Sequence, residues 1–430
     1  MLTRLLGSGS GSSMYELARD LYPICRSITG DGVRDTLDRV AAQLPLELSE
    51  VPSGTPVVDW TVPREWNIRE AWIKDPRGHK IVDFADHNLH VVSYSVPVHD
   101  HLSLDELKSR LHSLPDRPDW IPYRTSYYDE SWGFCLPHRQ LEALEEGTYE
   151  VYIDSDLEEG SLTYAECVIE GATDDEVLLS AHTCHPSLAN DNLSGIALLV
   201  RLGRALADIE TRYTYRLIFA PGTIGSITWL AKNQEKASNI KHGLTISCVG
   251  DAGGPMYKCS RRGDAAIDRA VARVFADSAP SGDIQDFSPY GYDERQYCSP
   301  GFNLPVGLFE RSKYGEFPEY HTSADNLDFI SAEELDRSYG LVARVVDLLE
   351  TDWFPVNAAP FCEPQLGRRG LYKAMGGDNE RVERQMAMLW ILNLADGEHT
   401  LHDIADRAGI EITRIREVAE LLLEHELITR

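Results

Sequence analysis

Three histidines and an aspartate are spaced along the chain in a way that could gather them around a metal ion. A short apolar segment, 176–181, has the character of a buried strand and runs into His182 and His185. Asp191 follows at the start of an apolar helical pattern, and His321 lies much later in a polar turn. Imidazole and carboxylate groups are the ligands that zinc takes in proteins. The pattern therefore predicts the site of a metal-dependent hydrolase.

Each of these side chains also has an ordinary structural interpretation. Asp191 could cap the helix that follows it, and His182 could be a hydrogen-bonded core residue. His185 lies in a loop from which it could equally face solvent. None of these alternatives explains why the histidines and the aspartate occur together. We therefore expect one or both of the first two histidines to bind the metal with Asp191 and His321.

Two further groups could serve the same site. Asp251 lies in a glycine-rich turn, where it is either another metal ligand or ordinary turn chemistry. Arg261 and Arg262 form either a solvated turn or a clamp for a substrate carboxylate, since guanidinium binds carboxylates in a fork geometry.

Strand-like and helix-like segments alternate through the region that holds these residues. The predicted strands are 176–181, 215–220, 244–249 and 304–309, and the predicted helices are 193–207, 227–236, 265–276 and 331–350. Such alternation implies an α/β sandwich with a mostly parallel central sheet. Ligands of such folds bind beyond the carboxyl ends of the strands, which is where the candidate ligands fall.

The rest of the chain suggests three additional parts. Residues 1–13 are rich in Gly and Ser, which predicts a flexible lead-in. Residues 51–154 contain short apolar segments broken by Pro, Gly and Asp, which predicts an inserted β-rich domain. Its many aromatics, Tyr123 and Tyr127 among them, either pack in its core and turns or line a cleft shared with the next domain. Residues 370–430 contain three short helical patterns and predict a winged-helix-like unit. The α/β domain would then comprise 14–50 and 155–355.

Charge and cysteine usage restrict the partners and the compartment. The net charge is −28, and residues 380–430 hold six Arg, no Lys and eleven acidic residues, a balance of −5. Nucleic-acid binding needs clustered cations, so we expect no nucleic-acid partner and assign the C-terminal unit to packing or homo-oligomer formation.

No apolar run has the length of a membrane span. Eight scattered cysteines without a CxxC pair are typical of a cytoplasmic protein with reduced thiols.

Five short motifs resemble those of the zinc aminopeptidase, glutamate carboxypeptidase and glutaminyl cyclase superfamily. They are Ala181-His182, Asp191-Asn-Leu-Ser-Gly, Ser247-Cys-Val-Gly-Asp251, the segment from Tyr292 to Pro305, and Tyr320-His-Thr-Ser-Ala-Asp325. The whole chain resembles a bacterial aminopeptidase-like family with an inserted β-rich domain and a C-terminal winged helix. The resemblance implies one zinc ion, with two as the alternative, held by His182, Asp191, Asp251 and His321. It also implies that Asp293, Arg295 and Tyr320 help to bind substrate.

The chain departs from that superfamily at two positions. The superfamily carries a Glu-Glu pair, one glutamate being the general base, where this chain has the carboxylate-free stretch 219–226. Cys184 stands where an aspartate normally orients the first histidine. We therefore expect Glu316 or Glu319, near His321, to supply the missing base.

The sequence thus predicts a zinc-dependent hydrolase of an amide or peptide-like bond. The substrate would be a small or specialised molecule of a natural-product or polysaccharide pathway. The alternative is a binding protein that has kept the fold and lost the base.

Overall fold

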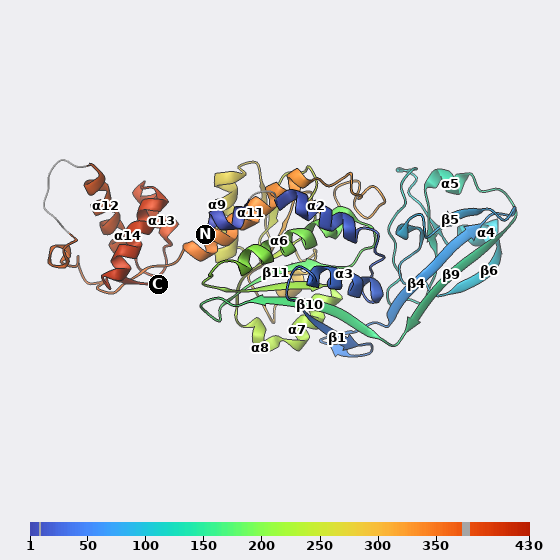
Figure 1. Cartoon of the computed structure of the whole chain (residues 1–430), viewed down its shortest axis with the longest axis horizontal. Helices are drawn as coiled ribbons and strands as arrows, with labels where there is room; N and C mark the ends of the chain where they lie inside the picture. The colour runs from blue at the N-terminus through green and yellow to red at the C-terminus, as the bar shows by residue number, and fades with distance from the viewer. Residues whose placement is uncertain (8–9, 372–378) are drawn as a thin grey trace. The chain divides into compact units, whose positions relative to one another are not determined.

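The computed structural model describes residues 1–7, 10–371 and 379–430, which fold into two compact units. The first unit spans Met1–Val345 and the second spans Val346–Arg430. Figure 1 colours the chain from its N-terminus to its C-terminus. All the candidate site residues belong to the first unit.

An eight-stranded mixed sheet forms the centre of the first unit. Its strands are ordered β1, β10, β12, β11, β13, β16, β14, β15. The strands β12, β11, β13 and β16 are parallel neighbours, whereas β10 and β14 pair with this central group in the antiparallel sense. The bounds are β1 Glu47–Pro52, β10 Ser161–Ile169, β11 Glu176–His182, β12 Thr214–Ala220, β13 Ile240–Ile246, β14 Met256–Lys258, β15 Asp283–Gln285 and β16 Val306–Glu310. The predicted α/β class is confirmed, although the antiparallel strands on both flanks make the sheet mixed.

Helices cover both faces of this sheet. In Figure 1, α2 and α6 lie on one side of it and α7 and α8 on the other, which explains why every residue of β11 and β12 is buried. The bounds are α2 Ser10–Leu21, α3 Asp31–Ala41, α6 Gly195–Ala207, α7 Ile224–Lys232, α8 Gln234–Ala237, α9 Ala266–Ser278, α10 Glu294–Tyr297 and α11 Ala332–Thr351. Because α6 follows β11 in the chain and packs on it, the start of α6 stands near the carboxyl end of β11.

The N-terminal segment contains helix where we expected a flexible lead-in. Helix α1 spans Leu2–Leu6 and α2 already begins at Ser10, while residues 8–9 lie outside the described residues. Leu5 is fully buried, and its carbonyl accepts a hydrogen bond from the hydroxyl of Tyr339 on α11. Tertiary packing therefore outweighs the low helix propensity of Gly and Ser here.

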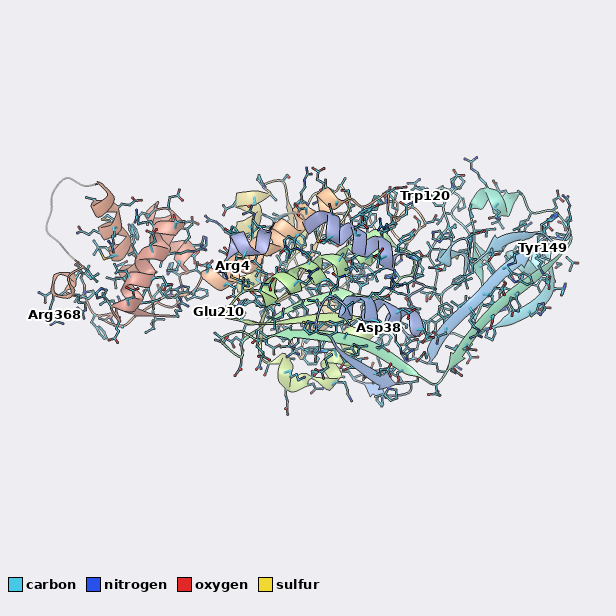
Figure 2. All side chains as sticks on the ribbon, viewed as in Figure 1. Arg4, Asp38, Trp120, Tyr149, Glu210 and Arg368 are labelled. Atoms are coloured by element: carbon cyan, nitrogen blue, oxygen red, sulfur yellow. The ribbon has the colours of Figure 1, made fainter. Side chains whose placement is uncertain are left out.

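The segment 51–154 is β-rich, as expected. Its main sheet has the order β5, β4, β9, β6. Alternate residues of β9 are buried, and Tyr149, labelled in Figure 2, lies in the apolar core of this insert. The bounds are β2 Pro56–Val57, β3 Trp60–Thr61, β4 Glu65–Lys74, β5 Lys80–Asp83, β6 Val98–Ser103, α4 Leu104–Lys108, β7 Leu111–His112, β8 Phe134–Cys135, α5 His138–Glu142 and β9 Thr148–Glu158. The insert and the α/β domain belong to one compact unit.

The second unit contains three helices and a short antiparallel strand pair. They are β17 Val356–Asn357, α12 Asn379–Leu394, α13 Leu401–Ala408, α14 Ile412–Glu424 and β18 Ile428–Thr429. Thr400 forms a capping box on α13, and Gly409 ends that helix with φ 63°. The apolar face of α14, including Ile415, Val418 and Leu422, packs inside this unit's own core. Part of the predicted domain 370–430, residues 372–378, lies outside the described residues.

All eight cysteines are free thiols, seven of them buried or half-buried and Cys362 exposed. Among the helices of the described residues, none has the length and apolar character that a membrane crossing demands.

His242 on β13 gives a test of the stability of the first unit. Burial beside Tyr213 lowers the pKa of this imidazole to about 4. The unfolded chain binds a proton near pH 6.5, so between about pH 6.5 and 4 the unfolded state holds more protons and stability falls as the pH falls. This group accounts for at most about 3 kcal/mol of that loss. In urea unfolding at about pH 7 and pH 5, His242→Phe should show a smaller pH dependence than the wild type, and an equal dependence would contradict this assignment.

Candidate metal centre

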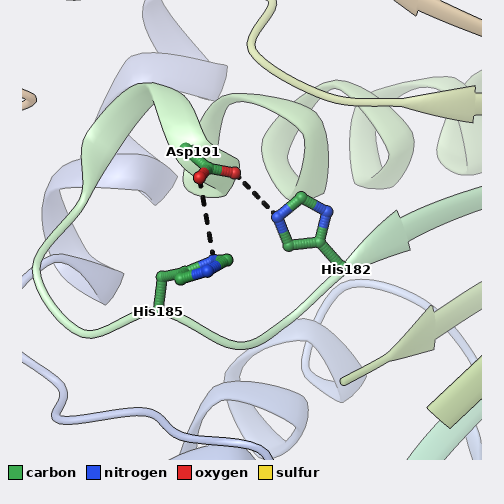
Figure 3. A group of neighbouring side chains, drawn as sticks. All are labelled: His182, His185 and Asp191. Atoms are coloured by element: carbon green, nitrogen blue, oxygen red, sulfur yellow. Dashed lines mark hydrogen bonds and ion pairs between the residues drawn. The ribbon is translucent and has the colours of Figure 1, made fainter. Parts of the chain in front are cut away.

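The candidate centre is built where β11 ends and α6 begins (Figure 3). His182 is the last residue of β11, and the loop after it brings His185 to the same place. An irregular helical turn, Ala189–Ser194, then carries Asp191 into the interior. All three side chains are buried. Their ligand atoms lie within 4.8 Å of one another, which is the spacing that a single cation could bridge.

Asp191 is the residue on which the histidines converge. Its Oδ1 lies 2.8 Å from Nε2 of His182, and its Oδ2 lies 3.0 Å from Nε2 of His321. Nδ1 of His185 lies 3.8 Å from the same Oδ2. The structure therefore brings together four of the five predicted metal ligands.

His321 reaches the group from a turn far along the chain. Its side chain is 32% exposed, compared with 10% for His185 and 0% for Asp191, so the group opens to solvent on the side of His321. Tyr320 stacks on the His321 ring with centroids 3.9 Å apart, and accepts a hydrogen bond from the hydroxyl of Tyr292. The Tyr292 ring in turn stacks on His182, with centroids 4.6 Å apart.

The charge of this buried group suits a cation. Burial alone would raise the pKa of the Asp191 carboxyl, but the surrounding histidines hold that pKa well below its usual value. Burial lowers the pKa of the His185 imidazole to about 3, so this imidazole is neutral near pH 7. A buried carboxylate costs several kcal/mol unless a positive charge offsets it. Neutral imidazoles with one carboxylate form a donor set of a catalytic zinc site.

Asn192 determines where His182 carries its proton. The Asn192 side-chain amide donates to Nδ1 of His182 at 3.3 Å, while its Oδ1 accepts from the backbone N–H of Gly195 and Cys248. This fixes the orientation of the amide, so a neutral His182 carries its proton on Nε2, where it donates to Asp191. A cation bound at that nitrogen would displace the proton, which couples metal uptake to proton release.

Asp251 follows β13, but its carboxylate is engaged elsewhere. It accepts hydrogen bonds from the side-chain amide of Asn190, the hydroxyl of Ser312 and a backbone N–H. These are the contacts of a side chain that fixes a turn. Asp325, which closes the Tyr320–Asp325 motif and for which the sequence predicted no role, accepts from the backbone N–H groups of Asn190 and Asp191. Burial raises the pKa of the Asp325 carboxyl to about 8.

The carboxylate-free turn after β12 lies against His182. A Cβ at Gly222 would stand 3.1 Å from Cβ of His182 and 3.6 Å from Oδ1 of Asp293. Cys184 is directed at this turn, where its thiol accepts from the N–H of Gly222 and donates to its carbonyl. Asp293 is buried and accepts a hydrogen bond from Ser226, and burial raises the pKa of its carboxyl to about 6. A carboxylate thus lies beside the turn, supplied by a different segment.

The other predicted site residues are more exposed. Arg261 and Arg262 lie in an exposed turn and donate to Asn303. Glu316 is 64% exposed and pairs with Lys313. Arg295, on α10, stands over the exposed ring of Tyr290, and Glu319 is half-buried two residues before His321.

One tyrosine of the insert, Tyr123, lies against the centre, and a second, Tyr127, supports it. The ring of Tyr123 lies nearly perpendicular to the rings of His185 and His321, with centroids 5.1 Å from each. Its hydroxyl shares a 2.9 Å hydrogen bond with that of Tyr127. The aromatic-rich composition of the insert indicated only that some of its rings could line a shared cleft.

Comparisons with known proteins identify relatives of the whole chain. A family model described as a domain of unknown function, DUF4910, matches residues 15–352, and a model described as a winged helix-turn-helix matches residues 353–430. A protein of Clostridium acetobutylicum, provisionally named a polysaccharide biosynthesis protein with an aminopeptidase-like domain, is 50% identical over 421 residues, covering 98% of this chain and 97% of that protein. A crystal structure from Clostridium acetobutylicum, provisionally described as a peptidase, has a TM-score of 0.88 at 49% identity, covering 97% of this chain and 96% of that chain.

More distant solved structures share the fold alone. A zinc aminopeptidase from Bacillus subtilis has a TM-score of 0.58 at 13% identity, covering 78% of this chain and 93% of that chain. A peptidase M28 precursor from Shewanella amazonensis has a TM-score of 0.58 at 14% identity, covering 81% and 95%. The aminopeptidase-like fold expected from the motifs is therefore confirmed.

Proposed function

Because the chain belongs to the DUF4910 family and has the fold of the zinc aminopeptidases, we propose that it is a zinc-dependent hydrolase of an amide or peptide-like bond. The convergence of three imidazoles on one buried, ionised carboxylate is the observation that carries this proposal. His182, His185, Asp191 and His321 would hold one zinc ion. A second ion would require Asp251 to leave its present partners, so we propose a single-metal site.

The reaction assigns separate roles to the residues around the centre. Bound zinc supplies a Lewis acid that polarises a carbonyl and acidifies water. We assign to Asp293 the role of accepting a proton from the attacking water and returning it to the leaving amine, since its carboxylate lies at the Gly222 turn that packs against His182 and burial raises its pKa to about 6. Glu319 and the more exposed Glu316 are the other candidates. Tyr320, stacked on His321 at the solvent side, would donate a hydrogen bond from its hydroxyl to the substrate.

The substrate is proposed to be small or specialised, because residues of the β-rich insert lie directly against the centre. The provisional name of the Clostridium relative favours a polysaccharide pathway over general peptide digestion. Arg295 would bind substrate near α10. Arg261 and Arg262 could bind a substrate carboxylate only after releasing Asn303.

Zinc analysis combined with an activity screen tests the proposed function. Purified protein should contain about one zinc per chain and hydrolyse some aminoacyl amides, with activity lost on chelation and restored by zinc. The alternative, a binding protein, is favoured by the carboxylate-free turn at Gly222. It would be supported by amide binding without turnover in zinc-loaded protein.

The winged helix-turn-helix domain is proposed not to bind DNA. On α14, Arg414 pairs with Glu417, and Arg430 just beyond the helix pairs with Glu420, so these cations are already engaged with carboxylates. Because non-specific DNA affinity comes from neutralising phosphates, a domain with an acidic balance should show little. A gel-shift assay with the whole protein at about 50 mM salt should show no shifted duplex at micromolar protein. Salt-sensitive binding under these conditions would contradict the prediction. The proposed role of this domain in homo-oligomer formation has its own test, because light scattering of the whole protein would then give a mass above that of one chain.

A further inference from the structure

The β-rich insert is joined to the turn that carries His321. The backbone N–H of Tyr123 donates to the carbonyl of His321 at 2.8 Å. Two residues further along, the N–H of Ile121 donates to the hydroxyl of Ser323, and the N–H of Ser323 donates to the carbonyl of Ile121. A strand-like contact between the two segments therefore fixes the His321 turn.

The insert also holds the loop that carries His185. The side-chain amide of Asn88 donates to the hydroxyl of Ser187 at 2.7 Å. Leu188 of the same loop packs in a buried cluster with Ile121 and Tyr123. The two histidine-bearing segments, far apart in sequence, thus converge on one region of the insert.

The backbone at both histidines needs such support. His185 has φ 87° and His321 has φ 55°, which is the left-handed region that side chains with a Cβ seldom adopt. Conformations of this kind persist only where the surroundings determine them. The carbonyl of His185 is held by the buried guanidinium of Arg26, and the carbonyl of His321 by the N–H of Tyr123.

Between these two segments lies the ring of Tyr123. It is 7% exposed and nearly perpendicular to both imidazoles, at 80° to His185 and 87° to His321. Its hydroxyl is bound to that of Tyr127, which fixes the ring from the far side. A flat side chain held in this way limits the rotation of both imidazoles.

We propose that Tyr123 is a positioning residue of the metal centre. Through it, the insert holds the imidazoles of His185 and His321 in the orientation that binds the metal, before the metal arrives. This inference rests on the proposed zinc site. Its claim that Tyr123 holds the two histidine-bearing segments in place concerns the metal-free protein and can be tested separately. Ligand-orienting residues around metal sites typically change metal affinity about 10- to 100-fold when replaced.

The test compares Tyr123→Leu, which loses the flat ring, with Tyr123→Phe, which keeps it and loses only the hydroxyl. Competition with a chromophoric zinc chelator should show about 10- to 100-fold weaker zinc binding for the leucine variant and a small change for the phenylalanine variant. Tyr128→Leu, at a neighbouring tyrosine that is 51% exposed, is the matched control and should bind zinc as the wild type does. In the metal-free protein, hydrogen exchange over residues 183–190 and 319–325 should be faster in the leucine variant alone.

Three outcomes separate this inference from the proposed function. Wild-type protein without zinc affinity would overturn the zinc site. Hydrogen exchange in the metal-free protein would still test whether Tyr123 holds the two segments in place. Unchanged zinc affinity and exchange in Tyr123→Leu, or equal losses in the leucine and phenylalanine variants, would overturn the role of the ring. If Tyr123→Leu does not fold, Ser323→Ala should weaken zinc binding to a lesser degree, and wild-type affinity in that variant would overturn the proposal.

Discussion

Asp191→Asn is expected to abolish zinc binding while leaving the fold intact. The substitution keeps the size of the side chain but removes the charge on which His182 and His321 converge. Without that charge the imidazoles alone have little to attract a divalent cation. The wild type should carry about one zinc per chain, and the variant should bind zinc about 100-fold or more weakly, beyond what loss of an outer-sphere contact causes. Metal analysis and chelator competition provide the measurement.

Asp328→Asn is the matched control, because it makes the same change at an exposed carboxylate and should leave zinc content unchanged. His321→Ala should also lose tight binding, since it removes the imidazole nearest to Oδ2 of Asp191. Full zinc occupancy in either Asp191→Asn or His321→Ala would rule out the proposed ligand set.

Asp293→Asn is expected to lower kcat by about two to four orders of magnitude with little change in zinc content. A carboxylate must be ionised to accept a proton, and the pKa of Asp293 is about 6 because it is buried. The wild-type rate should therefore fall as the pH drops below about 6, and the asparagine variant should lack this acid limb. The measurement is the pH profile of kcat on whichever aminoacyl amide the screen identifies.

Glu319→Gln and Glu316→Gln are the companion variants. If Asp293 is the proton acceptor, both should retain kcat close to that of the wild type. A large loss in Glu319→Gln with normal activity in Asp293→Asn would instead assign the role to the residue next to the His321 turn.

The sheet and its helices were predictable because their signals are local. Fully buried strands such as β11 and β12 appear as short apolar runs, and the apolar periodicity of α6 is that of a helix packed on a sheet. Helix α1 was not predictable, because the burial of Leu5 against α11 depends on a contact 334 residues away in sequence. The antiparallel flanks of the sheet likewise depend on pairings that no single segment encodes.

The candidate site was predictable where residues follow strands directly and unpredictable where tertiary contacts decide. His182 ends β11, so strand-end reasoning located it with Asp191. Asp251 lies in the turn beyond the end of β13, and the amide of Asn190 and the hydroxyl of Ser312 engage its carboxylate. Tyr123 was only one of several aromatics that could line a cleft, because its place against His185 depends on how the insert folds back onto the α/β domain.

The turn at Gly222 has a consequence for any attempt to rebuild a glutamate base there. A side chain at this position would begin 3.1 Å from Cβ of His182, and the thiol of Cys184 binds both the N–H and the carbonyl of the same residue. Because 3.1 Å is tighter than an ordinary Cβ contact, His182 or the turn would have to shift by a few tenths of an ångström. A glutamate installed at Gly222 alone would therefore crowd the histidine that ends β11, and a new carboxylate is better introduced from another segment.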